Sequence, residues 1–220
     1  MNSEESASYN AIFKEASVYL GNIAFSDEQN EHIQTRMAQY SYAYVNDKCS
    51  VEEFCASVFS LMEEMYFMSL NFSEAVLARW YTTSGRPMSK EEKELRESPL
   101  ETEIFKISSF IRVEVLKRKP KLAKSPIFYE FVRKVILDGR FERGRTGFIF
   151  QLLPRTKKTE GIDFVPFVEN RFYAGSTFIA LLNLKDGRFV KEAERFLESK
   201  PKHPYRRQIK RYIERYKENE

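Results

Sequence analysis

Apolar residues recur at helical spacing along almost the whole chain, and this periodicity constrains the fold more than any other feature of the sequence. Tyr9, Ile12 and Ala16, for example, lie three and four residues apart, which places them on one face of a helix. The spacing returns in segment after segment, and only 8 glycines and 8 prolines interrupt the 220 residues. No stretch shows convincing two-residue alternation bounded by hairpin turns. The sequence therefore predicts an all-α protein.

Several helix starts are marked by a serine that is followed three residues later by a glutamate. In this capping box, the two side chains satisfy two backbone N–H groups that the first helical turn leaves unbonded. The pairing occurs at Ser50, Ser89 and Ser98, and Pro99 suits the first turn of the third helix. Ser26 is a further capping candidate. We therefore predict that helices begin at or just after these four serines.

The polar stretch over residues 82–87, TTSGRP, breaks the helical pattern and is the best candidate for a linker. We therefore expect an N-terminal helical bundle over residues 1–81 and a helical-repeat region over residues 88–220. A chain of 220 residues suits one domain or two small ones. The two regions are accordingly either separate or parts of one continuous domain.

The sequence lacks the patterns of secreted and membrane proteins. The longest run without a charged residue, residues 172–184, has 13 residues, whereas a membrane-spanning helix needs about 20. Its aromatic and β-branched residues leave a strand as an alternative, but its length favours a buried helix. The first ten residues are acidic and polar, unlike a signal peptide. Two cysteines, Cys49 and Cys55, are too few for a disulfide framework. We expect a cytoplasmic protein without a membrane partner.

Charge is divided unevenly between the two halves of the chain. Residues 1–110 contain 9 Lys and Arg and 18 Asp and Glu, a net charge of −9, whereas residues 111–220 contain 27 and 14, a net charge of +13. Such asymmetry is typical of proteins with a charged partner, commonly nucleic acid, an anionic membrane surface or an acidic protein. The alternative is that the halves pack together, so that their fields partly cancel and the remaining charges lie on solvated helix faces.

The C-terminal half is weakly repetitive. Residues 138–141 and 186–189 share the sequence DGRF, and each follows an apolar helical stretch, so we expect the same tight turn at both places. A second register, shifted by 29 residues, aligns Leu152 with Leu181. Short helices joined by short loops suit a stacked array of helical hairpins. A compact irregular bundle fits the same pattern.

Residues 171–216 resemble HEAT repeats, in which an arginine precedes a helix with small residues and the pattern L-x-L-x-D-x-R leads to a second helix. The matching positions are Arg171, Ala174, Leu182, Leu184, Asp186, Arg188, Ala193, Phe196 and Leu197, followed by Arg206 and Arg207 of the next unit. A HEAT-like region would begin at about residue 126, and the N-terminal half shows no resemblance. The resemblance implies a right-handed α-solenoid whose concave face binds protein or nucleic acid, usually without catalysis. Small bacterial proteins of this kind serve as immunity proteins, adaptors and nucleic-acid-binding modules.

The sequence offers little for catalysis or metal binding. The two histidines, His32 and His203, are far apart, and Cys49 and Cys55 lack the spacing of zinc ligands. Cys55 lies on an apolar helix face, so we expect a buried structural thiol. We therefore predict no catalytic residue, no cofactor and no metal.

Two weaker candidates involve glutamates and glycines. Glu63 and Glu64 lie among apolar residues, so one of them could be partly buried with a raised pKa, as an acid or base requires; the alternative is a solvated face. Gly144 and Gly147 precede a helix beside arginines. This arrangement fits either an anion site at the helix start or close packing of helices.

The C-terminal segment carries the strongest candidate surface. Residues 200–220 contain eight Lys and Arg and three Glu, a net charge of +5. The predicted basic surface consists of Arg207, Lys210, Arg211 and Arg215, extended by Arg140, Arg143 and Arg145 if the helices stack side by side. Such a surface suits phosphate contacts, and the interleaved tyrosines suit stacking on single strands. The alternative is a basic outer face that keeps a terminal repeat in solution.

These observations lead to three hypotheses about function. The first is a non-enzymatic helical-repeat protein that binds another protein, as an immunity or adaptor protein that inhibits a toxin would. The second is a nucleic-acid-binding protein that uses the basic C-terminal half. The third is an all-α enzyme of unknown reaction, with Glu63 or Glu64 as acid or base. The sequence does not indicate the oligomeric state.

Overall fold

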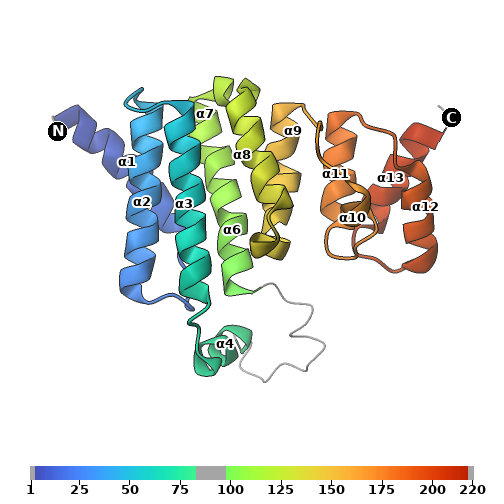
Figure 1. The fold of residues 1–220 in the computed structure, drawn as a ribbon, viewed down its shortest axis with the longest axis horizontal. Helices are drawn as coiled ribbons and strands as arrows, with labels where there is room; N and C mark the ends of the chain where they lie inside the picture. Colours follow the sequence, from blue (N-terminus) through green and yellow to red (C-terminus); the bar gives the residue numbers. More distant parts are fainter. Residues whose placement is uncertain (1–2, 83–97, 218–220) are drawn as a thin grey trace.

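The computed structural model describes residues 3–82 and 98–217, and every regular element within them is a helix (Figure 1). The predicted all-α class is confirmed. The first helices are α1 (Ser3–Tyr19), α2 (Asp27–Val45), α3 (Val51–Ser69) and α4 (Glu74–Tyr81). The middle of the chain forms α6 (Pro99–Phe110), the π-helical η1 (Ile111–Val115), α7 (Leu116–Arg118), the 3-10 helix η2 (Pro120–Lys124), α8 (Pro126–Leu137), the 3-10 segment η3 (Gly139–Arg145), the π-helical η4 (Phe148–Leu152) and α9 (Leu153–Thr156). The last helices are α10 (Val165–Val168), α11 (Ala174–Leu184), α12 (Val190–Ser199) and α13 (Arg206–Tyr216). None of the helices in the described ranges combines the length and apolarity that crossing a lipid bilayer requires.

The predicted helix starts are confirmed for α2, α3 and α6, each of which begins with a capping box. In α3, the Ser50 hydroxyl accepts a hydrogen bond from the Glu53 N–H at 3.1 Å, and the Glu53 carboxylate accepts one from the Ser50 N–H at 2.7 Å. Each box satisfies two N–H groups that the first turn leaves unbonded. The predicted cap Ser89 and residues 83–87 of the predicted linker lie outside the described residues.

A buried carboxylate ties the turn between α1 and α2 to α6. Glu103 of α6 is fully buried and accepts hydrogen bonds from the Gly21 N–H and from the Asn22 side chain. Lys106 supplies the countercharge at 3.2 Å and also donates to the Gly21 carbonyl. Gly21 has a φ of 106°, a conformation that favours glycine. Because a buried carboxylate is stable only when it is paired and hydrogen-bonded, this network fixes the register between the turn and α6.

One apolar core extends from α1 to α13. α6 packs against α1 and α3, and α3 in turn packs against α8. The helices before residues 83–97 and those after them therefore contribute to the same core.

The C-terminal helices α10 to α13 lie at the end of the molecule opposite α1 (Figure 1). Residues 174–184 form α11, so the interpretation of the long uncharged run as a helix rather than a strand is confirmed. α13 packs against both α11 and α12. Its fully buried Tyr212 donates a hydrogen bond to the Asp186 carbonyl at 2.9 Å and accepts one from the Phe189 N–H at 3.1 Å.

The two DGRF segments form turns with the same hydrogen bonds, as their shared sequence predicts. Asp138 accepts a hydrogen bond from the Arg140 N–H at 3.0 Å, and Asp186 accepts one from the Arg188 N–H at 3.2 Å. In both turns, the guanidinium group donates to the two carboxylate oxygens of the same aspartate. The hydrogen bonds from Arg140 hold the pKa of Asp138 below its ordinary value. One turn follows α8 and the other follows α11.

Candidate functional site

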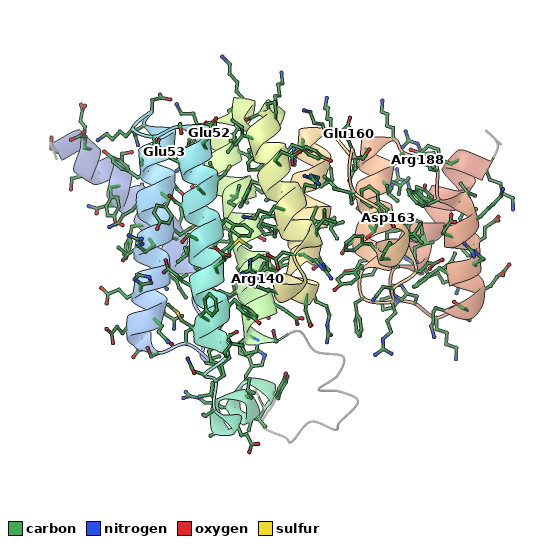
Figure 2. The ribbon with its side chains drawn as sticks, in the orientation of Figure 1. Glu52, Glu53, Arg140, Glu160, Asp163 and Arg188 are labelled. Atoms are coloured by element: carbon green, nitrogen blue, oxygen red, sulfur yellow. The ribbon has the colours of Figure 1, made fainter. Side chains whose placement is uncertain are left out.

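Arg140, the first residue of the predicted basic surface in sequence order, forms ion pairs with carboxylates of the protein itself. Its guanidinium group lies 2.7 Å from Asp138 and 2.9 Å from Glu63 of α3, and these two carboxylates raise its pKa. The group also lies over three aromatic rings, those of Phe59, Tyr66 and Phe141. Arg140 therefore links the turn after α8 to α3 in the middle of the molecule (Figure 2).

Arg143 and Arg145 also make internal contacts. The backbone N–H of Arg143 donates to the Glu101 carboxylate at 3.1 Å, and the Nε atom of the Arg143 side chain lies 3.8 Å from the same oxygen. Arg145 donates to the Ile136 carbonyl at 3.0 Å and to the Tyr173 hydroxyl at 3.1 Å. The structure thus uses these arginines to join η3 to α6, to α8 and to the segment before α11.

Gly144 and Gly147 are packing positions. A Cβ atom at Gly144 would lie 2.7 Å from the Glu101 carbonyl oxygen, and one at Gly147 would lie 2.2 Å from the Ser108 hydroxyl oxygen. The two glycines therefore let η3 and the residues directly after it approach α6 closely, which agrees with the packing interpretation. The anion beside this turn is the protein's own Glu101 carboxylate.

Glu142 forms a carboxyl pair with Glu101 beside Arg140, in a cavity of about 350 Å³. Burial, followed by the hydrogen bond to Glu101 and its charge, raises the pKa of Glu142, while the charges of Arg143 and Arg145 act in the opposite direction. The backbone of Glu142 has a φ of 32°, where side chains are disfavoured. Because its pKa is raised, Glu142 holds a proton more readily than an isolated glutamate does.

The remaining sequence candidates have structural surroundings. The side chains of Glu63 and Glu64 are 36% and 38% exposed, and Glu64 lies 3.0 Å from His32, an arrangement typical of a solvated helix face with ion pairs. Cys55 is buried, as predicted, and burial raises its pKa to about 12. Within residues 3–82 and 98–217, no group of His, Cys, Asp and Glu side chains is arranged to hold a metal ion.

The basic residues of α13 have different surroundings from those of η3. Arg207, Lys210, Arg211 and Arg215 are all exposed. No carboxylate of the described chain lies within ion-pairing distance of these four side chains. The opposite face of the helix is anchored by Ile209 and Tyr212, both fully buried. The four predicted cations are therefore presented to solvent on a rigidly packed helix.

The structure also brings together five cations that sequence reasoning did not single out. They line one cavity near the ends of α7 and α9, and they are Arg112, Lys117, Lys124, Arg155 and Lys157. The basic segment over residues 117–124, KRKPKLAK, was a signal for two of them. The other three come from η1 and from the end of α9, and only the folded chain places them beside this segment.

In comparisons with known proteins, no protein family, no curated protein and no solved structure matches this chain.

Proposed function

We propose that this protein binds nucleic acid through the basic face of α13, without a catalytic role. The observation that carries the proposal is the exposure of Arg207, Lys210, Arg211 and Arg215 on a helix whose other face is buried. Exposed cations that lack carboxylate partners are available to phosphates, and neutralising phosphates releases condensed counterions.

The spacing of these residues fits a phosphate backbone. Arg207, Arg211 and Arg215 follow one another at four-residue intervals, so they form a row on one side of the helix. With a rise of 1.5 Å per residue, the row spans about 12 Å. Phosphates follow one another about every 3.4 Å along the axis of a duplex strand, so the row faces roughly three or four of them. Contacts of this kind position a helix without reading sequence.

The proposal is tested by fluorescence anisotropy with labelled single-stranded and double-stranded oligonucleotides, from about 50 mM to about 300 mM salt. We expect log affinity to fall linearly with log salt concentration, and the variant R207A/K210A/R211A to reduce the slope by about 2 to 3. The control variant R207K/R211K keeps the charge and should keep the slope. Absence of binding at about 50 mM salt, or a slope unchanged in the alanine variant, would contradict the proposal.

We also propose that α11 to α13 are arranged as a HEAT-like helical array. The support is the pair of equivalent DGRF turns after α8 and α11, together with helix bounds that coincide with the two helices of the resemblance. In such an array, each helix buries its apolar face against its neighbours in sequence. An experimental structure in which these helices do not stack as successive hairpins would overturn this arrangement.

A second candidate function is binding of another protein, as an immunity or adaptor protein would. It is favoured by a groove of about 640 Å³ between α3 and α8, lined by Phe59, Phe131 and the 45% exposed Leu137. Phe59 and Phe131 form the buried floor of this groove, and Leu137 presents an apolar side chain at its surface, as the apolar core of a protein interface requires. Leu137→Asp should abolish capture of a salt-resistant protein partner and leave oligonucleotide binding unchanged. If the two activities fall together, or neither changes, the groove is not the interface.

A further inference from the structure

A cavity of about 540 Å³ lies where η1, α7, η2 and α9 meet, at the edge of the molecule where α7 and α9 both end (Figure 1). Five of the ten residues that line it are cations, and none is acidic. The cations are Arg112 of η1, Lys117 of α7, Lys124 of η2, Arg155 of α9 and Lys157 directly after α9. The remaining surface comes from Leu116, Pro120, Ala123, Pro154 and Thr156.

The charge of this cavity is not neutralised from within the described chain. All five cations are exposed, and none of them lies within 4.0 Å of a described carboxylate. Two neighbours in the same basic segment behave differently, because Arg118 pairs with Glu114 and Lys119 lies 2.6 Å from Asp47. The five cations that line the cavity therefore lack the carboxylate partners that these two neighbours have.

The neutral residues of the cavity offer no alternative countercharge. The Thr156 hydroxyl already donates to the Leu153 carbonyl at 2.7 Å and accepts from the Lys158 N–H at 3.3 Å. The carbonyl groups at the ends of α7 and α9 carry partial negative charge, which favours cations such as Lys117 and Arg155 in the last turns. This effect falls off within one turn, so it does not explain the presence of Arg112 and Lys124 in the same cavity. A ligand with several negative charges would relieve the repulsion among the five.

We propose that this cavity is a binding site for a ligand that carries several clustered phosphate groups. Its volume is within the range of small-ligand sites. Lysine and arginine are the usual phosphate-binding side chains, and arginine adds paired donors with fixed geometry. The site goes beyond the function proposed for α13, because its lining comes from η1, α7, η2 and the end of α9. The phosphates belong either to a free polyphosphorylated small molecule or to a nucleic-acid strand.

The test uses the full chain and inorganic tripolyphosphate as the probe, with isothermal titration calorimetry at about 50 mM salt. The site variant K117Q/K124Q/K157Q removes three cations of the cavity, and the control variant K191Q/K200Q/K202Q removes three exposed lysines elsewhere in the C-terminal half. We expect one binding site per chain in the wild-type protein, a loss of roughly 30-fold or more in the site variant, and less than about threefold in the control. Should the triple site variant not fold, K124Q alone is expected to weaken binding by roughly threefold to tenfold.

Two outcomes overturn the proposal. The first is that tripolyphosphate does not bind, and the second is that the control variant loses as much affinity as the site variant, which would indicate a diffuse charge effect.

The source of the phosphates follows from a second titration with a single-stranded oligonucleotide that lacks terminal phosphates. If tripolyphosphate displaces the strand and the site variant weakens both, the ligand is the nucleic-acid backbone. If only tripolyphosphate binding depends on the cavity, the ligand is a free polyphosphorylated molecule. Oligonucleotide binding that is lost only in the α13 variant would support the α13 proposal separately.

Discussion

The arginines of η3 and those of α13 have the same charge but different surroundings. The guanidinium groups of Arg140 and Arg143 lie within 4.0 Å of carboxylates on other helices, and that of Arg145 donates to a carbonyl and a hydroxyl of other segments. Arg207 and Arg211, in contrast, are exposed without an ion pair to the described residues. In η3, the chain uses positive charge to hold helices together. In α13, apolar residues hold the helix and the charge remains available. The comparison shows that a basic composition leaves positive charge available to a ligand only where the fold does not itself supply the counterions.

The packing of η3 against α6 is the part of this comparison that should respond most strongly to mutation. Gly144→Ala places a Cβ atom 2.7 Å from the Glu101 carbonyl and 2.8 Å from Ile104 Cβ. Since the backbone of α6 cannot move aside cheaply, we expect the free energy of unfolding to fall by about 3 kcal/mol. Urea denaturation measures the loss. Gly139→Ala is the matched control, because no atom lies within 4 Å of its added Cβ. Equal stabilities for the two variants would show that η3 is not tightly packed against α6 at Gly144, contrary to the first half of the comparison.

Alanine substitutions of one arginine from each group should have opposite effects on stability and on binding. Arg145→Ala removes two hydrogen bonds from a charged donor, to Ile136 and Tyr173, so we expect a loss of about 2 kcal/mol in the free energy of unfolding. Arg211→Ala changes an exposed side chain and should cost less than about 0.5 kcal/mol. The oligonucleotide affinity should respond the opposite way, falling in Arg211→Ala and staying unchanged in folded Arg145→Ala. Parallel losses in both measurements for both variants would show that the two sets of arginines are equivalent.

Local signals predicted the elements better than they predicted the availability of side chains. The capping boxes at Ser50 and Ser98 and the repeated DGRF turns depend on residues within a few positions of one another, so the sequence contains the whole interaction. The exposed face of α13 follows in the same way from helical periodicity. Arg140, in contrast, is paired with Glu63, which is 77 positions away in the chain. No periodicity of either segment indicates that contact.

The cavity proposed to bind phosphates illustrates the same limit. Lys117 and Lys124 belong to an obvious basic segment, but Arg155 and Lys157 join them only because α9 ends beside η2. Sequence reasoning identified the charge and missed the convergence, since convergence depends on tertiary packing.

The attachment of α13 is tested by a smaller change at its buried face. Tyr212→Phe removes the hydroxyl that donates to the Asp186 carbonyl and accepts from the Phe189 N–H. Both backbone groups then lack this partner, so we expect the free energy of unfolding to fall by about 1 kcal/mol. Urea denaturation again provides the measurement, and oligonucleotide affinity of the folded variant should be unchanged. An unchanged free energy of unfolding would show that the Tyr212 hydroxyl does not contribute to the attachment of α13.

The smallest expected effect concerns Glu142, the glutamate within η3 that lies near Arg143 and Arg145. Partial desolvation and the neighbouring Glu101 raise the pKa of Glu142, so the folded protein binds this proton more tightly than the unfolded chain does. The contribution to stability is complete below the ordinary glutamate pKa of about 4.5 and is lost as the pH rises through the raised pKa. Glu142→Gln keeps a neutral hydrogen-bond donor toward Glu101 at every pH. We therefore expect the variant to match the wild-type protein near pH 4 and to exceed it by about 0.5 kcal/mol at pH 7, a modest difference because Glu142 is exposed. Glu142→Ala is the control that removes the charge without keeping the hydrogen bond, and it should be less stable than Glu142→Gln at both pH values. If the wild-type protein instead gains stability relative to Glu142→Gln as the pH rises, the charges of Arg143 and Arg145 outweigh the effect of Glu101 on the Glu142 carboxyl group.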